Sequence, residues 1–175
     1  MSDPETAGAI TARGLMKADF RTIGSNVPLR EALRILTGCG DEQGPTPLVV
    51  TAPDGSFAGV LTPLALYLAL LKGIHIDDLG SIGEPDLLEA VRPELDQPVS
   101  AVMVTDVPLA RPEDRLFLLM KSATRYRVEY SLVLVQKRVV GVIFVTDIFR
   151  AAASLALAHE SKGISLPGGD EKLGH

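Results

Sequence analysis

Apolar residues recur along the chain in two stripes of helical spacing. Each stripe has four apolar residues at positions i, i+3, i+4 and i+7, which form one face of an α-helix. The first stripe is Leu29, Ala32, Leu33 and Leu36, and the second is Leu116, Leu119, Met120 and Ala123. Each predicted helix therefore needs an apolar surface on which to pack.

Two short apolar runs follow each stripe and predict β-strands joined by tight turns. They are residues 47–50 and 57–61 in the first half, and residues 131–135 and 138–145 in the second. The first turn contains Asp54 and Gly55, and the second is centred on Gln136 and Lys137. A further helix is predicted to close each half, at residues 63–72 and 147–159.

The two halves repeat one another. Their leading segments align without a gap at a constant offset of 87 residues, which places Met16 on Met103 and Asp19 on Asp106. Each half thus predicts a unit of short strand, helix, strand, strand and helix, a mixed α/β (α+β) fold. A unit of about 60 residues buries too little surface to be stable alone. We therefore expect the two sheets to pack together over one core.

The remaining segments are predicted to be connections. Residues 73–98 form a linker with one short helix at 86–91 that ends at Pro93. Residues 161–175 are rich in glycine and polar residues, and predict a disordered tail.

Charge and composition narrow the function further. The 175 residues carry a net charge of −5 without a long basic tract, which argues against nucleic acid as a partner. The apolar runs are shorter than a membrane span, and the first residues lack the apolar core of a secretory signal. One cysteine, Cys39, permits no internal disulfide. These features predict a soluble, cytoplasmic protein.

The order of elements in the second half, "VSAVM", a helix, "SLVLV" and "GVIFVTDIF", resembles a CBS domain. The first half resembles one through "GLM", "TIGSNVPLREALRIL" and "TPLVVTAPDGSFAGVLT". The resemblance implies tandem CBS repeats at residues 12–72 and 99–160, packed by pseudo-two-fold symmetry with two clefts between them. It also implies a regulatory module that forms a homodimer, binds AMP, ADP, ATP or S-adenosylmethionine, and acts on an unknown partner protein.

The ligand signature of this family is Gly, two apolar residues, Ser or Thr, two variable residues and Asp. A carboxylate can accept hydrogen bonds from both ribose hydroxyls, whereas a hydroxyl and the amides of a helix N-terminus can donate to phosphate. The second half starts the signature at Gly141 and keeps Asp147, but has Phe144 at the hydroxyl position. The first half keeps Thr62 but has Ala65 at the Asp position. Each half therefore has one of the two polar groups.

Both polar groups also have a purely structural interpretation. Thr62 followed by Pro63 is a good helix N-cap with proline at the first helical position. Asp147, preceded by Thr146, is a natural cap or first-turn acid that can pair with Arg150 three residues later. The resemblance nevertheless assigns Thr62, Thr146 and Asp147 to ligand binding.

The stretch "RYRVEYS" leads into the strand that lines the second cleft in this family. Arg125 and Arg127 are candidates for binding phosphate, and Tyr126 or Tyr130 for stacking on a base. Val128 and Phe144 complete the predicted ligand-binding set. The alternative is an exposed basic loop.

Two further observations bear on function. The matching loop of the first half contains Asp41 and Glu42, which would repel phosphate and so favour the cleft around Asp147. Cys39 lies near these acids, and the three histidines lack metal-ligand spacing, so neither an enzyme nor a metal site is predicted. Because the signature is incomplete in both halves, a ligand-free dimerisation or scaffold module is the alternative function.

Overall fold

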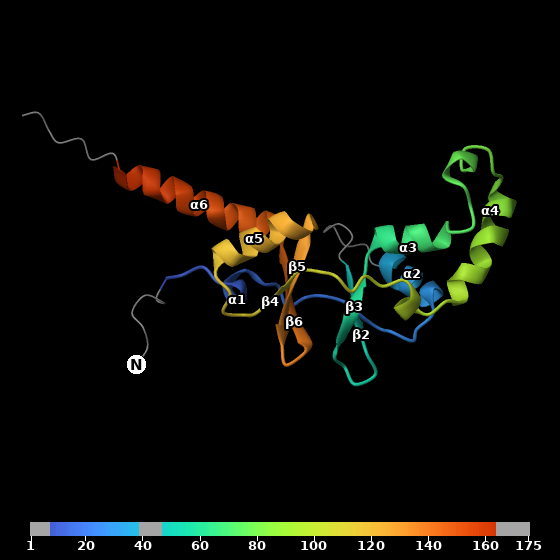
Figure 1. Cartoon of the computed structure of the whole chain (residues 1–175), viewed down its shortest axis with the longest axis horizontal. Helices are drawn as coiled ribbons and strands as arrows, with labels where there is room; N and C mark the ends of the chain where they lie inside the picture. Colours follow the sequence, from blue (N-terminus) through green and yellow to red (C-terminus); the bar gives the residue numbers. More distant parts are fainter. Residues whose placement is uncertain (1–7, 39–46, 164–175) are drawn as a thin grey trace, which may run out of the picture.

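The computed structural model describes residues 8–38 and 47–163 (Figure 1). The inferences about Cys39, Asp41 and Glu42, and about the tail from residue 164 onward, concern residues outside this part of the chain.

Each half forms one three-stranded sheet, in the orders β1-β2-β3 and β4-β5-β6. In each sheet the first pair of strands is parallel and the second pair antiparallel. The strands are β1 (Thr22–Gly24), β2 (Leu48–Thr51), β3 (Phe57–Leu61), β4 (Leu109–Ala110), β5 (Tyr130–Val135) and β6 (Arg138–Phe144). The four longer strands lie within one residue of their predicted bounds, which confirms the mixed α/β fold class.

The helices follow the predicted order around these sheets. They are α1 (Ala12–Leu15), α2 (Leu29–Thr37), α3 (Pro63–Leu70), α4 (Glu84–Val91), α5 (Leu116–Tyr126) and α6 (Val145–Gly163), with short 3₁₀ helices η2 (Ile76–Asp78), η3 (Arg92–Asp96) and η4 (Val99–Ala101). Figure 1 shows α3, α5 and α6 on the same side of the sheets. Within the described ranges, no helix is long and apolar enough to cross a bilayer.

Some predicted helix boundaries differ from the structure: α3 ends at Leu70 rather than at residue 72, and α6 runs over Val145–Gly163 rather than residues 147–159. The linker helix α4 ends at Val91, as predicted, and the chain continues directly into η3, in which Pro93 occupies one of the first positions. Proline is tolerated there because its missing N–H would have no partner within the helix. The last helix begins at Val145 rather than Asp147, so Asp147 lies in its first turn.

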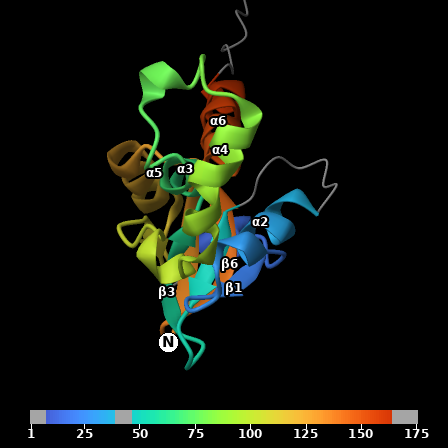
Figure 2. The same ribbon diagram turned by 90° about the vertical axis from the view of Figure 1, so that its right-hand side faces the viewer.

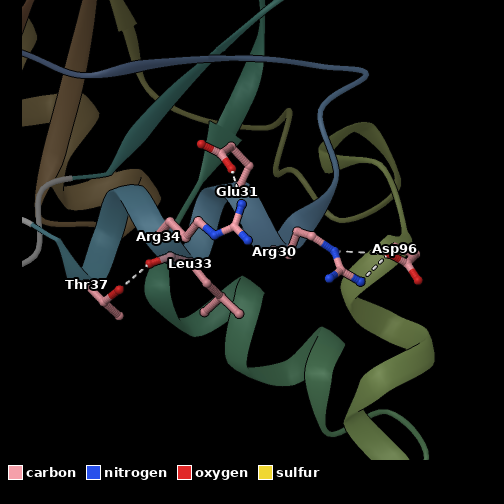
Figure 3. A network of polar contacts seen from close by, with 6 residues as sticks. All are labelled: Arg30, Glu31, Leu33, Arg34, Thr37 and Asp96. Atoms are coloured by element: carbon pink, nitrogen blue, oxygen red, sulfur yellow. Dashed lines mark hydrogen bonds and ion pairs between the residues drawn. The ribbon is translucent and has the colours of Figure 1, made fainter.

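The end of the linker is held against the first half. Arg30 of α2 forms an ion pair with Asp96 of η3, in which Nε lies 3.1 Å from Oδ1 (Figure 3). On the same helix, Arg34 Nη1 lies 2.9 Å from Glu31 Oε2, and the Thr37 hydroxyl donates to the Leu33 carbonyl at 2.7 Å. The Arg30–Asp96 pair, unlike the other two contacts, joins segments that are distant in sequence.

The leading segment of each half packs on the other half. The Ala12 N–H donates to the Asp114 carbonyl at 2.8 Å, and the Val99 N–H donates to the Val27 carbonyl at 2.8 Å. Isolated β-bridges repeat this exchange symmetrically: they are Thr11 with Arg115, Pro28 with Pro98, Lys17 with Val142, and Val60 with Val104. Figure 2, turned by 90°, shows β1, β3 and β6 from a second direction. The exchange gives the molecule its pseudo-two-fold symmetry.

The expected shared core is present, and a separate core flanks it on either side. The shared cluster contains Val49, Val60, Val107, Tyr130, Leu132 and Val142. One flanking cluster is built on the first half and includes Val99 from the second. The other is built on the second half and includes Ala12 from the first. The two halves are therefore joined both by their sheets and by the exchanged segments.

Candidate functional site

The candidate site is centred on the carboxylate of Asp147, in the first turn of α6. Its side chain is only 17% exposed. Oδ1 lies 3.5 Å from Arg150 Nη1, and Oδ2 lies 3.4 Å from Lys17 Nζ. Oδ2 is buried and accepts no hydrogen bond from a described residue. Each oxygen of the carboxylate is thus compensated mainly by one cation, and the predicted pairing with Arg150 is confirmed.

Lys17 reaches Asp147 because the leading segment of the first half crosses strand β6. The Lys17 N–H donates to the Val142 carbonyl at 2.8 Å, and the Val142 N–H donates to the Lys17 carbonyl at 2.9 Å. The ammonium also lies 5.2 Å from the centroid of the Phe144 ring, within the range of a cation–π contact. Lys17 is not among the site residues predicted from the sequence, because no local pattern indicates which half a leading segment packs on.

Gly141 is what allows the leading segment to approach β6 so closely. A Cβ at this position would lie 2.9 Å from Cβ, Cγ and Sδ of Met16. The matching Gly59 would place a Cβ 2.9 Å from Met103 Sδ and 3.0 Å from the Val104 carbonyl oxygen. The glycine of the signature therefore has a packing role in both halves.

The start of β5 lies beside the start of α6. The Val145 N–H donates to the Glu129 carbonyl at 3.0 Å, and Tyr130 pairs with Phe144 across the two strands. Val128 and Phe144 are partly buried against the shared core. Tyr130 is buried in that core, and its burial raises the pKa of the phenol above the ordinary value. The Tyr130 ring is therefore not an open stacking surface in this structure.

The structure separates two other predicted residues from Asp147. Arg125 and Tyr126 belong to the last turn of α5 and line a hollow of about 250 Å³ together with Leu109 of β4. The Arg125 guanidinium lies 5.7 Å from the centroid of the Tyr126 ring. The hollow at Asp147 has a volume of about 460 Å³ and different walls: Gly14, Leu15, Met16, Lys17, Asp147, Arg150, Ala151 and Ser154.

Arg127 and Thr146 lie at the ends of helices and are both exposed. Arg127 follows α5 as its C-cap with φ 55°, in the left-handed region, and Thr146 is the second residue of α6. Thr146 therefore lies next to Asp147. Neither side chain lines the hollow at Asp147.

Among the described residues, the first half has no counterpart of the charged pair formed by Asp147 and Lys17. Thr62 is the N-cap of α3 and accepts a hydrogen bond from the Ala65 N–H at 3.1 Å, as the capping interpretation predicted. Val104 bridges Val60 as Lys17 bridges Val142, so Val104 occupies the position of Lys17. By the same correspondence, Ala65 replaces Asp147. The charged group around Asp147 is therefore specific to the second half.

The chain consists of two α/β units that are related by pseudo-two-fold symmetry and exchange their leading segments. This is the arrangement of a tandem pair of CBS-type repeats. The model of the CBS domain family matches residues 99–154. The second half is therefore similar to a CBS domain, and the chain has the fold of CBS-domain-containing proteins, as expected from its sequence. No curated protein matches the chain.

Several solved structures share this fold. A CBS-domain-containing protein of unknown function from Kribbella flavida has a TM-score of 0.66 at 19% identity, over 83% of this chain and 99% of that one. The CBS domain pair of protein MJ0100, solved with 5′-methylthioadenosine and S-adenosyl-L-methionine, has a TM-score of 0.61 at 17% identity, over 84% and 98%. CBSX2, solved with AMP, has a TM-score of 0.60 at 15% identity, over 83% and 98%.

Proposed function

We propose that the chain is a cytoplasmic regulatory module that binds an adenosine nucleotide at Asp147 and acts on a partner protein. The observation that carries this proposal is the largely buried Asp147 carboxylate, which accepts no hydrogen bond at Oδ2 from the described residues, is paired there only with the Lys17 ammonium at 3.4 Å, and borders a hollow. Structures of the same fold solved with adenosine compounds support it. We assign residues 12–72 and 99–160 to the two repeats and residues 73–98 to the linker.

Each part of such a ligand has a matching group at the start of α6 or on the segments beside it. The Asp147 carboxylate would accept hydrogen bonds from the ribose hydroxyls. The exposed Thr146 hydroxyl and the N-terminus of α6 would favour an anion nearby, because the helix dipole is positive at that end. Phe144 and Val128 would supply apolar contacts to the base. Binding is proposed for the second half alone, since Ala65 offers no carboxylate in the first.

A thermal-shift screen with AMP, ADP, ATP and S-adenosylmethionine tests this proposal. A ligand at 100 times its Kd should stabilise the wild type by about 2.7 kcal/mol. For a chain of this size we expect Tm to rise by about 5–10 °C. Asp147→Ala should abolish the shift, whereas Asp106→Ala, an exposed acid in the leading segment of the second half, should preserve it. A flat screen with correctly folded wild type would contradict the proposal.

A ligand-free dimerisation module is the second candidate, because large side chains are exposed on the helical side of the molecule. Tyr67 of α3 is 56% exposed, Phe117 of α5 is 72% exposed, and Phe149 of α6 is 70% exposed. Exposed aromatic residues of this kind are typical of protein interfaces. Both candidate functions are compatible with a homodimer formed through these helices.

Sedimentation analysis of single variants tests the dimer. The wild type should sediment as a dimer at micromolar concentration, and Phe149→Glu should shift it to a monomer, because a buried unpaired carboxylate is costly. Lys137→Glu, at the exposed hairpin tip, is the control and should leave the dimer intact. A dimer combined with a flat nucleotide screen would favour the scaffold function, and a monomeric wild type would exclude it.

A further inference from the structure

Lys17 belongs to the leading segment of the first half, whereas Asp147 belongs to the second half. The net charge around Asp147 therefore depends on a residue that the first half contributes. From this geometry we propose that Lys17 makes the Asp147 site selective for phosphorylated adenosine nucleotides over uncharged nucleosides. The inference rests on the proposed function and specifies the class of ligand.

The cations face solvent more than the carboxylate does. The side chains of Lys17 and Arg150 are 50% and 78% exposed, whereas that of Asp147 is 17% exposed. A ligand that enters from solvent therefore meets two positive charges before it reaches one negative charge. The local excess of positive charge favours an anionic ligand.

The existing ion pairs convert this charge excess into selectivity. Ribose hydroxyls can replace the cations as partners of the Asp147 carboxylate, but only if Lys17 and Arg150 move away from it. A nucleoside leaves the two displaced cations without an anion, whereas a nucleotide phosphate can receive them. The binding free energies of the nucleotide and the nucleoside therefore differ by the free energy gained when the displaced cations pair with the phosphate.

Lys17 is well placed to make this exchange without a backbone rearrangement. Its backbone is held by two hydrogen bonds to Val142, and its ammonium lies over the Phe144 ring as well as near Asp147. The flexible four-carbon stem allows the ammonium to turn toward a phosphate while the backbone stays paired. The first half offers no such group, because Val104 occupies the equivalent position.

Isothermal titration of AMP and adenosine tests the selectivity directly. Wild-type protein should bind AMP at least about tenfold more tightly than adenosine. Lys17→Met, which keeps the apolar stem, should bring this ratio below about threefold by weakening AMP, whereas Lys17→Arg should retain the preference. Lys121→Met is the matched control, because Lys121 lines the separate hollow near Arg125, and it should leave the ratio unchanged.

The outcomes separate this inference from the function on which it rests. Equal affinities of the wild type for AMP and adenosine, unchanged in Lys17→Met, would overturn the selectivity and leave an adenosine site in place. Loss of the AMP preference in Lys121→Met instead would overturn it by moving the phosphate to the α5 hollow. If neither compound binds to folded wild type or variant at millimolar concentration, both the selectivity and the adenosine site are wrong.

Discussion

Leu132→Ala is expected to lower the free energy of unfolding by about 3 kcal/mol, and therefore Tm by roughly 10 °C. Leu132 is fully buried on the central strand of the second sheet. It belongs to the shared core together with Val49 and Val60 of the first half. The substitution removes the contacts of a large side chain and leaves a cavity that packed neighbours fill only in part.

The same variant shows whether the two halves unfold together. Calorimetry should show one unfolding transition for the wild type and one for Leu132→Ala. In the variant, amide hydrogen exchange should be faster than in the wild type in β2 and β3 as well as in β5 and β6. Leu118→Ala, at a position that is 50% exposed, is the control and should cost less than about 1 kcal/mol. Two separate transitions, with faster exchange in the second half alone, would show that the halves fold independently.

Local periodicity was sufficient to predict the repeating unit. The helical stripe from Leu29 and the apolar run at 57–61 each depend on neighbours within a few residues, and both elements occur where they were predicted. The capping role of Thr62 could also be predicted from the sequence, because Thr at the N-cap with Pro at the first helical position is a pattern of adjacent residues. Elements set by short-range spacing were thus accessible from one sequence.

The composition of the site was less accessible, because it depends on contacts between distant segments. Arg125 was expected near Asp147, but α5 places it in a different hollow. Lys17 was not predicted to belong to the site, although it follows Met16, which aligns with Met103 in the repeat. One signal was available: Gly59 and Gly141 inside predicted strands indicate a close approach of another segment. That signal does not identify the segment, and so could not supply Lys17.

Gly141→Ala is expected to destabilise the fold by about 2 kcal/mol and to weaken nucleotide binding at Asp147. Gly141 has no positive φ, so alanine would suit the strand itself and the loss arises from packing. The new Cβ would lie 2.9 Å from Cβ of Met16, an atom fixed to the backbone that pairs with β6. Relief of the clash must therefore move the leading segment, and with it Lys17.

Chemical denaturation of three further variants isolates this contact. Gly14→Ala is the matched control, since a Cβ there meets nothing within 4 Å and alanine favours the helix, so stability should be unchanged or slightly higher. Adding Met16→Gly to Gly141→Ala should recover part of the loss, because it removes the three atoms nearest to the new Cβ. Met16→Gly alone completes the double-mutant cycle. If Gly141→Ala were as stable as wild type and bound nucleotide equally well, the close crossing of the leading segment over β6 would not determine the geometry of the site.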